Sequence, residues 1–385
     1  MALFCQKGLK SKTLTGEEAQ CLQAVAAVIK NNIPFPSYGR TDSDTVLYGA
    51  IAVAAGKHSI TSYTQEHDNL PSHTTCLDRL HNLDLDELEK QSSRMLIEAA
   101  GSVIETGKAY NFVIDITDDP YYGTRQGTYA YNIVGGKRKA STNHFYAYIS
   151  LYIASKGKHI TLATYTWTQL DTLVEAVKKC VELIKSLGLE IASLCIDREF
   201  YVAKIFRYLQ EQNIPHIVPM KLQNDKVKNQ LTGRSSRKFE YTLKSGKDDE
   251  VVVQIVDCVA YAKGKKGQHG LKHRCFVVYG LNASPSTVRK IYSHRFGIES
   301  SYRIRNQAKA RTTTKDPVIR YFYTLIAFLI QNLWIKIQWL NFRKIQRGPA
   351  TVHSGAFKMS HMLQSILEEA STLFPLILYK KLILH

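Results

Sequence analysis

The hydrophobic pattern between Asn111 and Pro219 constrains the fold of this chain more than any other feature. Asn111 to Asp115 is an apolar run that ends in a carboxylate, and Ile191 to Asp197 is a second run of the same kind. Short apolar runs rich in β-branched residues are typical of buried strands. The other elements expected here are extended segments at 129–133, 144–153 and 159–167, a helix at 169–187, a helix at 201–212 and a strand at 214–219.

This order predicts an α/β domain with a ribonuclease-H-like mixed sheet, in which the two acid-tipped strands are neighbours. Their acids, Asp115 and Asp197, would then meet although 82 positions separate them. An Asp at a strand end is often only a turn former, so neither acid alone indicates a site. Asp118 and Asp119 precede Pro120, and we expect them to form a turn beyond the first strand.

A third acid comes from the stretch Ile291 to Arg311. Tyr292, Arg295 and Glu299 stand at offsets of zero, three and seven, which places them on one face of a helix. The alternative interpretation is an amphipathic helix with a single structural Glu–Arg pair. Glu199, two residues after the acid of the second strand, is the competing third carboxylate.

Three crowded carboxylates repel one another unless a cation neutralises them. Asp115, Asp197 and Glu299 together provide the oxygen ligands that two Mg²⁺ ions prefer, and Mn²⁺ is an expected substitute. Such a pair of ions activates a water or a 3′-hydroxyl and stabilises the leaving oxygen in phosphoryl transfer. We expect Arg295 to neutralise a phosphate and Tyr292 to hydrogen-bond to a nucleotide or stack on it.

The net charge of +18 is concentrated in two segments. Residues 201–290 carry 17 Lys and Arg against 7 Asp and Glu, and residues 291–347 carry 11 against 2. Such a concentration favours a polyanionic partner, nucleic acid above all, rather than a small-molecule substrate. Lys263, Lys265 and Lys266 stand in a glycine-rich turn and are expected to contact DNA phosphates.

The remaining pattern divides the chain into five parts. These are a helical N-terminal domain at 1–110, a first part of the catalytic core at 111–220, a mostly β, basic insertion at 221–284, a second part of the core at 285–345 and a helical tail at 346–385. Segments 59–67 and 72–83 resemble a helix-turn-helix that binds DNA ends, although a plain helical docking unit has the same pattern. The second of these helices would present His73, Thr75, Arg79 and His81.

The cysteines and the apolar segments predict the compartment. The seven cysteines include no C-x-x-C pair, which argues against a zinc ribbon or a disulfide framework and fits a reducing cytoplasm. The N-terminus lacks the apolar core of a signal peptide. The apolar stretch Tyr321 to Leu340 contains Asn332 and Lys336, which indicates a buried core helix rather than a membrane span. We therefore expect a cytoplasmic, nucleoid-associated protein.

The motifs around the three acids resemble those of DDE transposases of the insertion-sequence-four-like superfamily, and more narrowly of its haloarchaeal-type branch. Residues 112–117 (FVIDIT) resemble the first-acid motif, and residues 195–201 (CIDREFY) resemble the second. Tyr292-x2-Arg295-x3-Glu299 matches the Y-R-E signature of the superfamily in both spacings. The resemblance runs from about Asn111 to Trp334.

By this resemblance, the chain is a DNA transposase whose metal-binding catalytic acids are Asp115, Asp197 and Glu299. It would act as a homodimer on paired double-stranded DNA ends, cut at the inverted repeats of an insertion sequence and join the 3′ ends to target DNA. The signature ends with a Lys seven positions after Glu, where this chain has Asn306. Arg303, on the same helical face as Glu299, would supply the phosphate contact instead. A metal-dependent nuclease without strand transfer and a catalytically inactive DNA-binding derivative remain as alternatives.

Overall fold

The computed structural model describes residues 20–37, 42–155, 158–222, 231, 233–244, 250–262, 270–344, 347, 350–353 and 355–377. The N-terminal helices are α1 (Cys21–Asn32), α2 (Ser43–Ala55), α3 (Ile60–Glu66), α4 (His73–His81) and α5 (Leu85–Ala100). The first part of the core contains β1 (Ala109–Tyr121), β2 (Ile133–Lys139), β3 (Thr142–Ser155), β4 (Lys158–Trp167), α6 (Leu173–Ser186), β5 (Glu190–Ile196), α7 (Ala203–Glu211) and β6 (His216–Pro219). The insertion contains β7 (Arg237–Lys244), β8 (Glu250–Ala262) and β9 (Gly270–Tyr279). The C-terminal part contains α9 (Pro285–Ser293), α10 (Phe296–Arg305), α11 (Pro317–Phe342), β10 (Arg343–Lys344), β11 (Thr351–Val352) and α12 (Met359–Leu373).

One large mixed sheet organises the molecule. Its strand order is β2-β3-β1-β5-β6-β9-β8-β7, and β4 pairs with β3. β1 is parallel to β5 and antiparallel to β3, and β5 is parallel to β6. The two strands that carry the first two acids are therefore neighbours, as the sequence predicts. This arrangement has the expected character of a ribonuclease-H-like fold.

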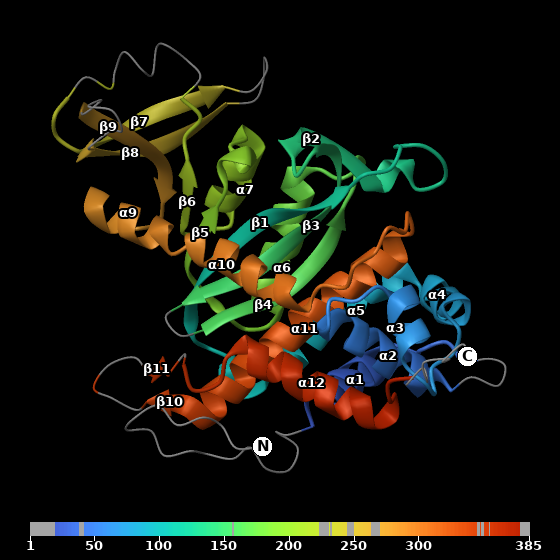
Figure 1. The fold of residues 1–385 in the computed structure, drawn as a ribbon. Helices are drawn as coiled ribbons and strands as arrows, with labels where there is room; N and C mark the ends of the chain where they lie inside the picture. The colour runs from blue at the N-terminus through green and yellow to red at the C-terminus, as the bar shows by residue number, and fades with distance from the viewer. Residues whose placement is uncertain are drawn as a thin grey trace, which may run out of the picture.

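The β-rich insertion continues this sheet. β9 pairs antiparallel with β6, and β8 and β7 follow it outward. Figure 1 shows β7, β8 and β9 at the end of the sheet remote from the N-terminal helices. The insertion is thereby joined to the core through backbone hydrogen bonds, which fix its orientation more firmly than a packed separate unit would.

The two faces of the sheet are covered by different helices. Phe112 and Ile114 of β1 lie in a core with residues of α6 and α7. Val113 lies on the other face, in a small core with Ile298 of α10. The side chains of β1 alternate between these faces, so Asp115 shares the face of Val113. The first acid therefore points toward α10.

The helix α11 is the core helix that the sequence predicts. It is long and apolar enough to cross a membrane, but 89% of its most apolar window is buried inside the protein. It packs against α5, α2, α4 and β4. Figure 1 shows it between the sheet and the group of N-terminal helices. This central position explains why α11 is apolar around most of its circumference, because other elements pack against it from several sides.

The end of β1 differs from the expected turn. β1 continues to Tyr121, and the register aligns Asp118 with Ala147 and Asp119 with Tyr146 of β3. The expectation that both acids form a turn is therefore wrong. Proline is tolerated where a strand has a neighbour on one side only. At Pro120 the neighbour of β1 is β3, because the pairing with β5 stops at Ile114.

The second helix of the expected helix-turn-helix presents fewer side chains than predicted. Arg79 is 2% exposed and donates a hydrogen bond to the Pro36 carbonyl at 3.0 Å. His81 bonds to Asp316, the residue that caps α11. Both side chains therefore attach α4 to neighbouring segments. Arg79 is withdrawn from solvent by its contact, whereas His81 stays exposed.

Asn332 ties three elements together in the interior. Its side-chain nitrogen donates to the carbonyls of Leu96 and Thr161 at 2.9 and 2.7 Å, and its oxygen accepts from the Thr161 N–H at 3.2 Å. Asn332 is fully buried, so water cannot replace these bonds. They connect α11 to α5 and to β4.

We expect Asn332→Leu to lower the free energy of unfolding by about 3 kcal/mol, because a leucine of similar volume leaves buried backbone groups unpaired. Urea denaturation followed by circular dichroism measures this change. The matched control is Gln364→Met on the exposed face of α12, where a change within about 0.5 kcal/mol is expected. Equal stability of the two variants would contradict the assignment.

Candidate active site

The guanidinium of Arg295 joins the three acids that the sequence singles out. Its Nη2 lies 2.9 Å from Oδ1 of Asp115 and 3.3 Å from Oδ1 of Asp197. Its Nη1 lies 3.5 Å from Oε1 of Glu299. Side chains from three distant parts of the chain therefore surround one cation.

The register of the sheet explains why the first two acids approach each other. The parallel ladder of β1 and β5 ends with Ile114 opposite Ile196. Asp115 and Asp197 are the residues that follow this last pair. Asp115 continues along β1, opposite Ser150 of β3, whereas Asp197 leaves the sheet as β5 ends.

The helix expected to carry Tyr292, Arg295 and Glu299 is interrupted at Arg295. The Arg295 N–H donates to the Tyr292 carbonyl, and the Ile298 N–H donates to the Arg295 carbonyl. Hydrogen bonds that span three residues tighten the turn and divide the stretch into α9 and α10. The prediction of one continuous helix is therefore wrong. Arg295 and Glu299 still meet, because four positions separate them across the first turn of α10.

The start of α9 is a capped turn. Ser284 is its N-cap and accepts a hydrogen bond from the Thr287 N–H at 3.2 Å, and Pro285 stands in the first turn. A hydroxyl cap with proline behind it is a strong helix start.

Burial dominates the electrostatics of this site. It raises the pKa of Asp115 to about 6; the guanidinium of Arg295 opposes this rise and the charge of Asp197 adds to it. Burial alone would lower the pKa of Arg295, but the pKa is raised because Asp115, Tyr292 and Asp197 surround it. Asp115 and Arg295 are 8% and 7% exposed. The acids therefore depend on Arg295 for a counter-charge.

The other expected site residues lie in different surroundings. Tyr292 is 8% exposed and its ring packs on Phe276 with 5.0 Å between centroids, so the ring offers little open face for stacking. Arg303 is exposed and donates to Ser300 at 3.2 Å. The lysines Lys263, Lys265 and Lys266 lie outside the described residues. Glu199, the competing third acid, is exposed in the short turn after β5, and no contact between it and Arg295 is found in the described part of the chain.

The donor set fits a hard divalent cation in its chemistry. Carboxylate oxygens are the ligands that Mg²⁺ and Mn²⁺ prefer, and Asp115, Asp197 and Glu299 already surround a positive charge. Among the described residues, no three acids, histidines or cysteines stand close enough to hold an ion by themselves. The reason is visible in the contacts: the carboxylates converge on the guanidinium of Arg295 instead of on a common point.

A second charged group, which the sequence pattern does not predict, lies on the same strand. Asp119 follows Asp115 by four positions on β1, contacts Lys309 and pairs with Arg320 at 3.1 Å. Arg320 also donates to the Thr314 carbonyl at 2.7 Å. The spacing of four was the available signal, because such residues share a face of a strand. The turn propensity of Asp118, Asp119 and Pro120 hides this spacing, because it predicts that the strand ends at Asp115.

We expect Arg295→Met to destabilise the protein by about 3 kcal/mol at neutral pH, because it leaves buried Asp115 beside Asp197 without a counter-charge. Adding Asp115→Asn to this variant should restore part of the loss, since it removes the stranded charge. Urea denaturation of the two single variants and the double variant measures the coupling.

The matched control is Arg303→Met, an exposed arginine on the same helix, for which little change is expected. Strictly additive effects of Arg295→Met and Asp115→Asn would show that the two side chains do not interact in solution.

Comparison with known proteins agrees with this architecture. The fold is similar to that of a piggyBac transposase in a synaptic complex with hairpin DNA, with a TM-score of 0.56 and 12% sequence identity over 93% of this chain and 78% of that chain. No curated protein matches the sequence. The profile of the family described as "Transposase DDE domain" matches residues 107–333, more than half of the chain and all three acids around Arg295. The chain therefore belongs to the family of proteins with a transposase DDE domain.

Proposed function

We propose that this protein is a DNA transposase that cuts double-stranded DNA at the inverted-repeat ends of an insertion sequence and joins the 3′ ends to target DNA. The observation that carries the proposal is the convergence of Asp115, Asp197 and Glu299 on one buried guanidinium. Family membership over residues 107–333 supports the same function. The Y-R-E spacing supports a place in the insertion-sequence-four-like superfamily, in its haloarchaeal-type branch.

The three acids are proposed to hold two Mg²⁺ ions, with Mn²⁺ as a substitute. When bound, the ions supply activation of the attacking oxygen and stabilisation of the leaving oxygen in phosphoryl transfer. Asp115 is held by the sheet and Glu299 by the first turn of α10, so the protein fixes their relative positions in advance. Divalent ions would take over the neutralisation that Arg295 provides here, which frees its guanidinium for a substrate phosphate.

The surrounding residues are proposed to bind DNA around this centre. Arg303 is exposed four positions after Glu299 on α10 and is assigned the phosphate contact that Asn306 cannot make. Tyr292 is assigned a hydrogen bond rather than a stacking contact, because its ring is packed. The three lysines at 263, 265 and 266 are assigned nonspecific contacts to the phosphate backbone.

We assign a separate role to each part of the chain. The helical domain at 1–110 is proposed to dock DNA ends, the core at 111–220 and 285–345 to perform the chemistry, and the insertion at 221–284 to contact the backbone. The tail at 346–385 supports the helical layer through α12. A homodimer on two paired ends, acting on nucleoid DNA in the cytoplasm, completes the proposal.

One observation favours a second candidate, a catalytically inactive DNA-binding derivative. The guanidinium of Arg295 occupies the space between the acids, and a protein that never binds ions would keep it there. A nuclease of the same fold without strand transfer is the third outcome. An assay on duplex DNA that carries the inverted repeats distinguishes cut and joined products, cut products only, and a shifted band without cutting.

We expect Asp115→Asn, Asp197→Asn and Glu299→Gln each to reduce Mg²⁺-dependent cleavage at least about 1000-fold, because each removes a carboxylate from transition-state stabilisation. DNA binding in a mobility-shift assay should persist. Glu199→Gln is the matched control and should cut normally. Loss of cleavage in Glu199→Gln with normal cleavage in Glu299→Gln would move the third acid to position 199.

A further inference from the structure

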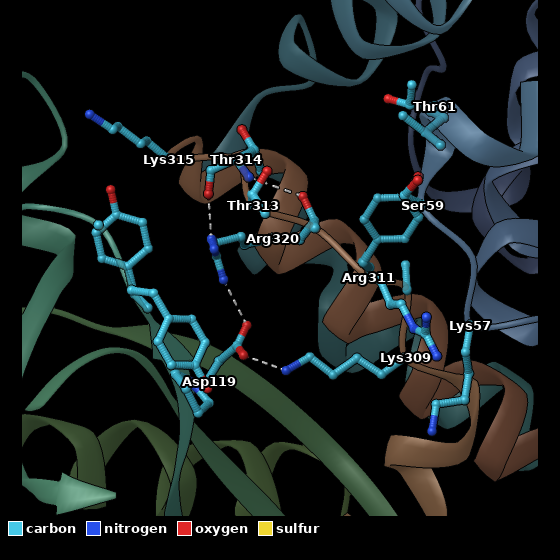
Figure 2. Close-up of a pocket in the computed structure, with 18 of the residues that line it drawn as sticks. Lys57, Ser59, Thr61, Asp119, Lys309, Arg311, Thr313, Thr314, Lys315 and Arg320 are labelled. Carbon is cyan, nitrogen blue, oxygen red and sulfur yellow. Dashed lines mark hydrogen bonds and ion pairs between the residues drawn. The ribbon is translucent and has the colours of Figure 1, made fainter. Parts of the chain in front are cut away.

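A cleft of about 1100 Å³ opens between the N-terminal helices and the end of β1 (Figure 2). One wall comes from the junction of α2 and α3, including Lys57 and Ser59. The opposite wall comes from β1 at Asp119, and the floor from the segment 309–315. The Arg311 N–H donates to the His58 carbonyl at 2.9 Å, which ties the floor to the first wall.

The cleft carries a surplus of positive charge. Five cationic side chains line it, and Asp119 is the acid among them: Lys57, Lys309, Arg311, Lys315 and Arg320. Asp119 is engaged by Lys309 and Arg320, which Figure 2 shows converging on it. The other three cations are exposed, and within the described parts of the chain none of them has an ion-pair partner. Three hydroxyl side chains, Thr312, Thr313 and Thr314, add hydrogen-bond donors.

The backbone conformation of Lys57 is unusual for a lysine. Lys57 has φ of +56°, in the left-handed region where glycine or asparagine is usual. It follows the C-cap of α2, and the His58 N–H bonds back to the Val53 carbonyl as in a standard helix stop. A lysine at this point costs some stability, which is explained if its charge is used at the cleft.

We propose that this cleft binds the phosphate backbone of the DNA strand about four nucleotides from the scissile phosphate. Asp115 and Asp119 lie on the same face of β1, and four strand residues span roughly 13 Å. The rise along a duplex axis is about 3.4 Å per nucleotide, so a duplex whose axis runs along β1 advances by about four nucleotides between these two positions. Tyr122, which is 72% exposed on the lining, offers an aromatic face to a base of the same strand. The inference rests on the proposed action on DNA.

The first test measures binding and needs no cleavage. The variant Lys57→Asn/Arg311→Gln/Lys315→Gln removes the three unpaired charges, and asparagine suits the left-handed backbone at position 57. We expect the slope of log affinity against log salt for a 40-bp duplex, a length of about four helical turns, to fall by about 2 to 3, since each lost phosphate contact accounts for about 0.9. Fluorescence anisotropy across a salt series measures the slope.

The matched control removes the same charge from the opposite face of the sheet. Lys178→Gln/Lys185→Gln/Lys204→Gln neutralises three exposed lysines of α6 and α7. Its salt slope should equal that of the unaltered protein. An equal fall in both variants, or no fall in the cleft variant, would overturn the proposal. Calorimetric titration with inorganic phosphate tests whether the cleft is a small-anion pocket instead. Binding of phosphate together with an unchanged salt slope for DNA would also overturn the proposal.

The second test locates the contact along the strand. Single phosphates of the cleavage substrate are replaced by uncharged methylphosphonates, and binding by the unaltered protein is compared with binding by the cleft variant. Replacement three to five nucleotides from the cut should weaken binding to the unaltered protein several-fold and leave the cleft variant unaffected. Equal weakening of both proteins would overturn the proposal. Failure of the proposed cleavage would show as an absence of cut product from the unaltered protein and would leave the salt-slope result intact, so the two proposals fail separately.

Discussion

The pairing of one buried guanidinium with three carboxylates is the interaction on which the rest of the site depends. Asp115 and Asp197 are brought together by the sheet, and their mutual repulsion has to be offset before the fold can hold them there. Arg295 offsets it from the joint between α9 and α10, so the helix pair is fixed to the sheet by charge as well as by packing. As a consequence, a divalent ion that binds these carboxylates has to displace the guanidinium of Arg295 from them.

A single strand, β1, connects this centre to the cleft beside the N-terminal helices. β1 places Asp115 and Asp119 on one face, each neutralised by cations from the segment 295–320. The paired acids fix that segment against the strand at two points. The Arg311 N–H, in the same segment, donates to the His58 carbonyl. This bond attaches the junction of α2 and α3 to the core. The distance between the acid centre and the cleft is therefore fixed by the fold.

The sequence predicts the elements of this fold better than their junctions. The strands β1 and β5 and the helix α11 follow from apolar runs. Asp115 and Asp197 are predicted from the ends of two such runs, and Glu299 from its helical spacing to Tyr292 and Arg295. The turn propensity of Asp118, Asp119 and Pro120 predicts an end of β1 at Asp115. In the structure, pairing with β3 overrides this propensity and the strand continues to Tyr121. The joint at Arg295 was missed because three-residue hydrogen bonds leave no mark in the periodicity. The convergence of Lys309 and Arg320 on Asp119 depends on tertiary contacts alone.

The number of Lys and Arg in a segment overstates the positive charge that is exposed to a DNA partner. Residues 291–347 have a large excess of cations, yet Arg295, Arg305 and Arg320 are each at most 7% exposed. Two of these three, Arg295 and Arg320, neutralise acids inside the fold and so add nothing to the exposed cationic surface of this structure. The charge that faces solvent is the part left after internal pairs are removed, and at the cleft that remainder is Lys57, Arg311 and Lys315. One of them comes from the N-terminal domain, whose net charge is negative, so the electrostatic surface is assembled by the fold and not by any one segment.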